Sequence, residues 1–320
     1  MTVVQRIHGL DIRANVALPG IAPSPASTQD VELELVERLP APVPICVRYR
    51  AGTPGDVATR VEVGDDARGF TAFRYGDGTA IDVEHDARPA TIRAVIAPGQ
   101  TLEDLCAYLY GPVLGFLLRA RGRLALHASS VRIDDGVVLI AGASGAGKST
   151  TAAALAARGH APISDDLTAL ALDDGSVGAW PAFDHLRLWA EGARVVLGED
   201  DSLEQITPTW DKRRFPLDAH ALADGPFPLR AIVVLRPRRA GARPVLRTLV
   251  PARAVVTLAT LTYANHLLDV PMRARELGQL GALVRAVPVR ALTPPAGGDG
   301  LDALCDAIVR AATTCIPAVA

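Results

Sequence analysis

Short runs of alternating apolar and polar residues dominate the first hundred positions of the chain. Residues 31–35 alternate with period two, and residues 61–63 and 81–83 repeat the pattern. Such alternation places one face of a strand on a core and the other face in solvent. The segment Gly76-Asp77-Gly78 lies between two of these runs and is typical of a hairpin turn. The pattern predicts a β-rich N-terminal domain over residues 1–100.

The pattern changes after residue 100, where apolar positions become closely spaced. Thr101 and Asp104 have the spacing of a helix start, and the mostly apolar residues 102–119 follow them. A connecting helix is therefore expected over residues 101–121. An interruption is expected at Gly111-Pro112, because proline lacks the backbone N–H group that a continuous helix uses.

From residue 122 onward, apolar strand patterns alternate with longer segments of helical character, which is typical of an α/β domain. We expect strands near residues 128–133, 137–141, 167–172 and 231–235, and helices near residues 149–158, 252–267, 272–286 and 301–312. The alternation predicts one α/β domain over residues 122–320.

Composition narrows the class of protein. With 33 basic and 35 acidic residues the formal charge is −2, which gives no electrostatic reason to expect a nucleic-acid or anionic-membrane partner. Residues 107–118 form the longest apolar stretch, which is too short to span a bilayer, and residues 1–18 contain no signal-peptide core. The cysteines lack the paired spacing of zinc or disulfide sites; they are Cys46, Cys106, Cys305 and Cys315. These features predict a cytoplasmic protein with buried free thiols.

Residues 142–149 carry the strongest chemical signal. They satisfy the G-x-x-x-x-G-K-[ST] phosphate-binding loop, between an apolar strand and a helix. The glycines let backbone N–H groups turn toward a polyphosphate, and the helix N-terminus adds partial positive charge. Lys148 is expected to reach the β- and γ-phosphates, and the Ser149 hydroxyl to bind Mg²⁺. The predicted nucleotide-binding residues are Gly142, Ala143, Ser144, Gly145, Ala146, Gly147, Lys148, Ser149 and Thr150.

Several classes of phosphate-loop protein are excluded. The chain has no N-K-x-D guanine-binding motif and no L-S-G-G-Q signature of transport ATPases. The apolar strand at residues 231–235 ends at Arg236, where a motor-type ATPase would have a metal-binding aspartate. Only Lys148 and Lys212 of the 33 basic residues are lysines, so a lysine within the loop strengthens the nucleotide-site prediction.

Two acidic pairs are candidates for metal binding and proton transfer. Asp173-Asp174 precedes a glycine and is typical of a hairpin turn. Asp165-Asp166 ends the strand that follows the loop helix, and ligands of open α/β sheets lie at the carboxyl ends of strands. Phosphoryl transfer to a hydroxyl needs one group that accepts a proton and another that holds the metal. We expect Asp165 and Asp166 to divide those tasks, the alternative being that one of them caps a turn.

The stretch from Leu126-His127 through the loop to Asp165-Asp166 closely resembles the HPr kinase/phosphorylase family. That bacterial family phosphorylates a protein serine with ATP and Mg²⁺, on a fold related to phosphoenolpyruvate carboxykinase. His127 lies 22 residues before Ser149 and Asp166 lies 17 after it, as in the family. The resemblance implies an α/β P-loop domain of this type, with His127 in the active site, Asp166 as proton acceptor, Lys148 as catalytic phosphate ligand and Ser149 as metal ligand. A structural histidine is the alternative for His127.

Outside this stretch the sequence departs from the family. The metal-supporting glutamate of its E-I-R-G segment is missing, but Glu191 has the corresponding spacing from Ser149 and is, with Asp165, a candidate metal ligand. Arg187 is a candidate phosphate ligand, with a surface arginine as the alternative. Lys212 and Arg213 belong to a basic cluster that is a candidate for closing over phosphates or an acidic acceptor; a solvated charge run is the alternative.

Two further groups of residues are expected to play no chemical part. The tryptophans at positions 180, 189 and 210 are expected to pack, since scattered aromatic residues more often fill cores than form sites. Arg236, Arg238 and Arg239 are expected at the surface.

Residues 8–12 and 111–123 resemble HPr-kinase-like proteins, some of which are linked to ribosomally made peptides and phosphorylate a precursor serine. The combined prediction is a kinase that uses ATP and Mg²⁺ to phosphorylate a hydroxyl group. The leading acceptor is a serine of a peptide or protein, and the alternative acceptor is a small molecule with a hydroxyl group. A homo-oligomer is implied by the family alone. The alternative of another class is a nucleotide-dependent switch or binding module without an acceptor, whose β-rich half would recognise a partner.

Overall fold

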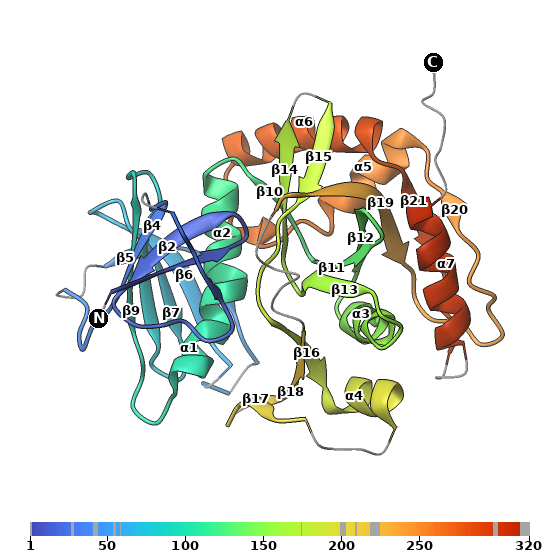
Figure 1. Ribbon diagram of the computed structural model, residues 1–320. Coiled ribbons are helices and arrows are strands. Elements are labelled where there is room, and N and C mark those ends of the chain that lie inside the picture. Colours follow the sequence, from blue (N-terminus) through green and yellow to red (C-terminus); the bar gives the residue numbers. More distant parts are fainter. Residues whose placement is uncertain are drawn as a thin grey trace. The chain divides into compact units, whose positions relative to one another are not determined.

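The chain forms two compact units in the computed structural model, which describes residues 2–26, 29–40, 44–53, 56–57, 59–173, 175–198, 203–208, 210–217, 225–296 and 300–313. The first unit consists of residues 1–122 and 264–272, and the second of residues 123–263 and 273–320. Asp174 and Cys315 lie outside the described residues. Each unit contains its own large sheet (Figure 1).

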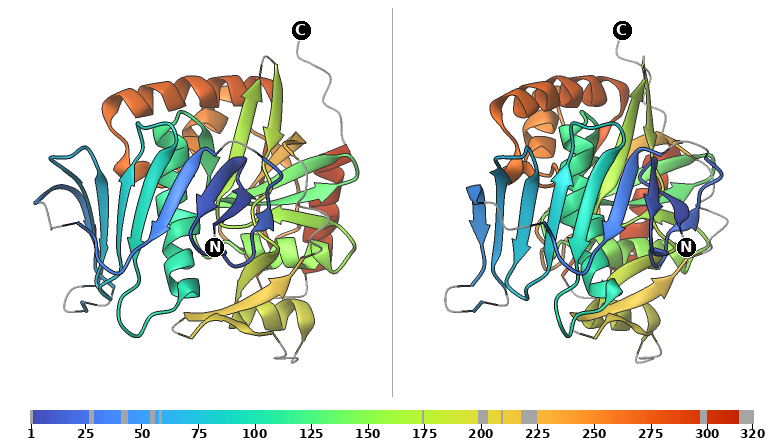
Figure 2. Two further views of the ribbon diagram at one scale, coloured as in Figure 1. Left: turned by 60° about the vertical axis from the view of Figure 1, so that its left-hand side comes forward. Right: turned by 90° about the vertical axis from the view of Figure 1, so that its left-hand side faces the viewer.

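The sheet of the first unit has the strand order β3-β1-β2-β4-β9-β8-β7-β6-β5 (Figure 2). Its strands are β1 (Val3–Ile7), β2 (Leu10–Ala14), β3 (Ala22–Pro23), β4 (Val31–Leu35), β5 (Ile45–Ala51), β6 (Val61–Asp66), β7 (Thr71–Tyr75), β8 (Ala80–Glu84) and β9 (Ala90–Val95). Strand β4 pairs in parallel with β2 and β9, and the other pairs are antiparallel. Buried and half-buried positions alternate along β9, as period-two patterning requires.

A helical segment belongs to the same unit and packs on its sheet. It consists of α1 (Leu102–Tyr108), a π-helical turn at Leu109–Val113, and α2 (Leu114–Ala120). Thr101 and Asp104 form a reciprocal capping box, as their spacing predicted. The Phe116 ring of α2 meets the Phe73 ring of β7 edge-to-face, with centroids 5.9 Å apart. The interruption expected at Gly111-Pro112 takes the form of this π-helical turn, which accommodates the missing N–H of Pro112 so that the chain stays helical.

The large sheet of the second unit follows the order β10-β14-β15-β19-β12-β11-β13, with β21 beside β19 and β20 beside β21. The strands are β10 (Leu124–Leu126), β11 (Ala128–Ile133), β12 (Gly136–Gly142), β13 (Ala161–Ser164), β14 (Thr168–Asp173), β15 (Ser176–Ala179), β19 (Phe227–Leu235), β20 (Arg247–Thr248) and β21 (Val289–Leu292). Strands β12, β19 and β21 are parallel, so their carboxyl ends lie along one edge of the sheet.

Helices cover both faces of this sheet. On one face Val138 and Ile140 of β12 pack with residues of α3 (Lys148–Ala156) and α7 (Leu301–Thr313). On the other face Val137 and Leu139 pack with residues of α5 (Pro251–Ala259) and α6 (Val270–Ala286). Every side chain of β12 is therefore buried, which explains why its sequence is continuously apolar rather than alternating.

The helix expected over residues 252–267 ends at Ala259. The next residues pair with the strand region at the start of the unit: the His127 N–H donates to the Leu261 carbonyl at 2.7 Å, and the Tyr263 N–H donates to the Ala125 carbonyl at 2.9 Å. These long-range hydrogen bonds replace the helical ones. They also bring Tyr263 next to His127, with the two rings edge-to-face at 5.8 Å.

A smaller sheet, with the order β16-β18-β17, completes the second unit. Its strands are β16 (His185–Trp189), β17 (Gln205–Thr207) and β18 (Trp210–Pro216), and α4 (Ala190–Leu197) follows β16 directly. Trp189 stands opposite Lys212 in the antiparallel register of β16 and β18. This pairing positions Lys212 by strand geometry, rather than leaving it in the loop that its charge run suggested.

Two sequence-based expectations concern residues spread over the chain. None of the helices among the described residues is long and apolar enough to cross a membrane. Cys106 and Cys305 are buried free thiols, as expected, whereas Cys46 is exposed because it lies on the outward side of β5.

We expect Leu139→Ala to lower the free energy of unfolding by about 2–5 kcal/mol, because it opens a cavity at a fully buried position of the interior strand β12. Leu277→Ala on α6 is the matched control, since Leu277 is 58% exposed and should change stability by less than about 0.5 kcal/mol. Urea denaturation followed by fluorescence measures both. Equal losses for the two variants would contradict the packing described here.

Candidate active site

The loop between β12 and α3 has the backbone geometry that a phosphate-binding loop needs. Gly142, Gly145 and Gly147 have φ angles of 156°, 76° and 96°, a region that side chains with a Cβ atom rarely occupy. Gly147 is the N-cap of α3 and no side chain caps that end, so the first N–H groups of the helix remain for another acceptor. The strand–loop–helix arrangement places residues 142–150 as their motif predicts.

Lys148 is held inside this loop. Its ammonium donates to the carbonyls of Gly142 and Ala143, both at 3.1 Å, and the residue is only 6% exposed. Burial lowers the pKa of Lys148 below its ordinary value, while the carboxylates of Asp166 and Asp165 act in the opposite direction. Lys148 lines the pocket that the loop borders.

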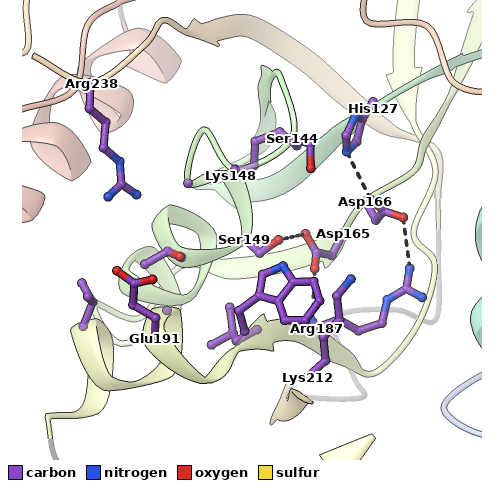
Figure 3. A pocket seen from close by; sticks show the side chains of 17 residues that line it. His127, Ser144, Lys148, Ser149, Asp165, Asp166, Arg187, Glu191, Lys212 and Arg238 are labelled. Carbon is purple, nitrogen blue, oxygen red and sulfur yellow. Dashed lines mark hydrogen bonds and ion pairs between the residues drawn. The ribbon is translucent and has the colours of Figure 1, made fainter. Parts of the chain in front are cut away.

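Asp165 is buried at the pocket, and both of its carboxylate oxygens accept hydrogen bonds. One carboxylate oxygen accepts from Ser149 Oγ at 2.8 Å and from Ser129 Oγ at 2.6 Å, and the other accepts from the Arg187 N–H at 3.1 Å. Only 1% of Asp165 is exposed. In this environment Asp165 fixes the position of the Ser149 hydroxyl (Figure 3).

Asp166 has the opposite surroundings. Its φ of 66° is left-handed, and about a third of its side chain (32%) is exposed in the pocket. His127 Nε2 lies 3.2 Å from one carboxylate oxygen. The Tyr263 hydroxyl donates to the other at 3.0 Å, and Arg187 Nη2 lies 3.6 Å from it. Figure 3 shows His127 and Arg187 on either side of this carboxylate.

The electrostatics of Asp166 follow from these contacts. Burial by itself raises the pKa of the carboxyl group, but the hydrogen bond from His127 and the charges of Arg187, His127 and Lys212 outweigh it. The pKa of Asp166 therefore lies well below its ordinary value. Asp166 is ionised at neutral pH and can only accept a proton there.

The smaller sheet forms a second wall with two cations. Arg187 on β16 has a side chain that is 6% exposed, and its Nε and Nη2 atoms have no hydrogen-bond partner within the described residues. Lys212 Nζ lies 5.0 Å from the centre of the Trp189 ring and 5.6 Å from that of Trp210. Burial, and then the charge of Arg187, lowers the pKa of Lys212, whereas Asp166 and Asp165 raise it. Both cations face the pocket.

Arg213 and Glu191, which were also singled out from the sequence, differ in their positions. Arg213 is not among the residues that line the pocket, because it follows Lys212 on β18 and so points to the other face of the strand. It pairs with Asp211 at 3.4 Å. Glu191 lines the pocket from the start of α4. Figure 3 shows Glu191 and Arg238 on the opposite side of Lys148 from His127 and Asp166.

The oxygen atoms of the site suit a hard cation. Within the described ranges, no group of three or more His, Cys, Asp or Glu residues is arranged to hold a metal ion. Mg²⁺, however, usually keeps several waters and takes one or two protein oxygens together with phosphate oxygens. The Ser149 hydroxyl, with Asp165 behind it, fits that pattern.

Sequence reasoning gave no role in the site to Trp189 and Arg238, which line the pocket, or to Tyr263, which contacts Asp166. Trp189 was expected to pack in a core but is 60% exposed and lines the pocket, and Arg238, expected at the surface, lies against Gly147 of the loop. Arg238 follows β19, the parallel neighbour of β12, and this strand-end position was the available signal. For Tyr263 no local signal exists, because the pairing of residues 261–263 with the start of the unit is long-range.

Comparisons with known proteins add little. No family model matches the sequence, and no curated protein matches it. Among solved structures, the Hpr(Ser) kinase/phosphatase from Coxiella burnetii is 17% identical in an alignment that covers 58% of this chain and 93% of that one, with a TM-score of 0.31. The functional conclusion therefore depends on the residues of the pocket.

We expect Asp166→Asn to change how stability depends on pH. Folding lowers the pKa of Asp166, so the stability that its ionisation contributes is complete above the unfolded value of about 3.9 and is lost as the pH falls through the folded value. The melting temperature of the wild type relative to that of the variant should therefore stay constant from about pH 6 to about pH 5 and fall progressively below that. Thermal melts across that range measure the difference. Asp173→Asn is an exposed control, and a constant difference for Asp166→Asn would contradict the lowered pKa.

Proposed function

We propose that this protein is a phosphotransferase that uses ATP and Mg²⁺ to phosphorylate a hydroxyl group, with a serine of a peptide or protein as the leading acceptor. One observation carries the proposal: an ionised, partly exposed carboxylate, Asp166, lies in the same pocket as a phosphate-binding loop and its buried lysine. A site that only bound a nucleotide would have no need for a proton acceptor at this position. The serine preference rests on the family that residues 125–170 resemble.

The proposed reaction assigns one task to each group. As the acceptor oxygen bonds to the γ-phosphorus, its proton passes to Asp166, the bond between the γ-phosphorus and the β–γ bridging oxygen breaks, and ADP leaves. Lys148 and the loop N–H groups stabilise the charge of the transferring group. His127 and Tyr263 hold Asp166 in place through one carboxylate oxygen each. Mg²⁺, held by Ser149 with Asp165 behind it, would neutralise phosphate charge.

The smaller sheet supplies the acceptor side of the proposed site. Arg187 and Lys212 bring positive charge next to Asp166, and Arg187 Nε, which has neither a hydrogen bond nor an ion pair among the described residues, suits a phosphate oxygen. Within the part of the chain that the structure describes, the Lys212 ammonium makes cation–π contacts with two indole rings and not an ion pair with a carboxylate. Its charge therefore stays available to a ligand. A nucleotide-dependent switch without an acceptor remains the competing outcome of the experiment below.

We expect Asp166→Asn to lower phosphate transfer by about 10²–10⁴-fold while ATP still binds, because the amide cannot accept the proton. The measurement is mass spectrometry of a panel of serine-bearing peptides and proteins, with free serine, after incubation with enzyme, ATP and Mg²⁺. Lys148→Ala should lose ATP binding as well, and Asp173→Asn should retain activity because that residue is exposed and outside the pocket. Tight ATP binding with slow hydrolysis and no modified acceptor would favour the switch.

A second prediction concerns the metal. Ser149→Ala should raise the Mg²⁺ concentration needed for half-maximal activity by about tenfold, because the metal loses a protein oxygen. Ser149→Thr is the matched variant, since it keeps a hydroxyl and the motif accepts either residue. Magnesium titrations of the transfer rate compare the three proteins. If the wild type, Ser149→Ala and Ser149→Thr all show the same dependence of rate on magnesium concentration, Ser149 does not bind the metal.

A further inference from the structure

A second hollow adjoins the phosphate loop on the side away from Asp166. It shares five lining residues with the pocket described above: Gly147, Thr150, Glu191, Val195 and Arg238. It continues between α3 and the start of α7, where the lining becomes mainly apolar with Ala146, Pro294, Pro295, Leu301 and Leu304. All of these residues belong to the second unit. The two hollows together form one path that passes over the loop.

The loop and the catalytic groups give this path a direction. Asp166 and His127 mark the end at which the terminal phosphate must lie, because a proton acceptor has to reach the attacking hydroxyl. Figure 3 shows Glu191 and Arg238 beyond Lys148 on the other side. A triphosphate whose terminal group faces Asp166 therefore has its remaining end directed toward the second hollow.

Two glycines let charged residues stand at the entrance of this hollow. A Cβ on Gly192 would lie 2.8 Å from Thr150 Oγ1, so glycine permits the close approach of α4 to α3 that brings Glu191 beside the loop. A Cβ on Gly147 would lie 2.7 Å from Arg238 Nη2, so this guanidinium rests against the loop itself. The structure gives neither Glu191 nor Arg238 a hydrogen bond or an ion pair with any residue that it describes. Both charges are free to meet a ligand.

We propose that this second hollow is the nucleoside subsite, an inference that rests on the phosphotransferase function proposed above. Arg238 binds the phosphate nearest the sugar, and the Glu191 carboxylate accepts hydrogen bonds from the ribose hydroxyls, as acidic residues do in dinucleotide-binding folds. The base packs against the apolar surface of Val195, Pro294 and Leu301. The phosphoryl donor is then a nucleoside triphosphate and not an inorganic polyphosphate.

This assignment gives Glu191 a different task from the metal binding that its sequence spacing suggested. Ser149 and Asp165 lie together on the catalytic side, whereas Glu191 lines both hollows and stands at the junction between them. The two roles predict different behaviour. A ribose contact depends on the sugar hydroxyls of the ligand, whereas a metal contact affects every magnesium-bound polyphosphate to the same extent.

The test is calorimetric titration, in the presence of Mg²⁺, with three probes: ATP, 2′,3′-dideoxy-ATP and inorganic tripolyphosphate. The wild type should bind ATP at least about tenfold more tightly than tripolyphosphate. Leu301→Trp, at a residue that lines the second hollow but not the phosphate pocket, should reduce that preference to less than about threefold without weakening tripolyphosphate binding, because the indole occupies the hollow. Glu191→Gln should reduce the preference for ATP over the dideoxy analogue.

The controls separate this inference from the function on which it rests. Arg239 is adjacent to Arg238 in the sequence but lines neither hollow. Arg239→Ala should therefore leave all three affinities unchanged. Equal affinities for ATP and tripolyphosphate, both lost in Lys148→Ala, would overturn the nucleoside subsite and leave the phosphate site standing. A wild type that binds none of the probes would overturn both proposals. An equal loss for all probes in Glu191→Gln would overturn the ribose role of Glu191. Circular dichroism of each variant verifies folding.

Discussion

The buried carboxylate of Asp165 ties together the parts of the second unit on which the pocket depends. Its three hydrogen bonds come from Ser129 on β11, Ser149 on α3 and the backbone of Arg187 on β16. A buried charge is tolerated only when such partners replace water, so the positions of the strand, the helix and the smaller sheet are fixed relative to this group. The wall that carries Arg187 is thereby held in register with the phosphate loop.

Asp166, the residue next to Asp165, is not buried in this way because its backbone conformation differs. Asp166 adopts a left-handed conformation, which turns its side chain away from the buried network and into the pocket. Strain of this kind is costly for a residue with a Cβ atom and persists where the surroundings enforce it, here by contacts from His127, Tyr263 and Arg187. Two adjacent carboxylates thus have separate environments, one buried in a hydrogen-bond network and one exposed in the pocket.

Charge in the pocket is unevenly neutralised. Asp166 is surrounded by cations, yet Lys212 is held by aromatic rings and Arg238 by no partner within the described residues. Among the described residues, the Lys148 ammonium donates hydrogen bonds only to carbonyls of its own loop. Such an excess of positive charge around uncapped N–H groups is what a polyphosphate stabilises. The same imbalance supports both the phosphotransferase proposal and the nucleoside path beyond the loop.

The sequence by itself determined the elements whose signals are local. The glycine spacing of residues 142–149 specifies the loop, the capping box at Thr101 specifies where α1 begins, and the strand end at Asp165-Asp166 predicts carboxylates near the phosphates. Only the tertiary structure decided which of the two carboxylates is buried. It also ended α5 early and brought Tyr263 to the site, because backbone pairing between residues far apart in sequence outweighs helical preference. The exposure of Trp189 depends in the same way on how strands pair, which no local pattern encodes.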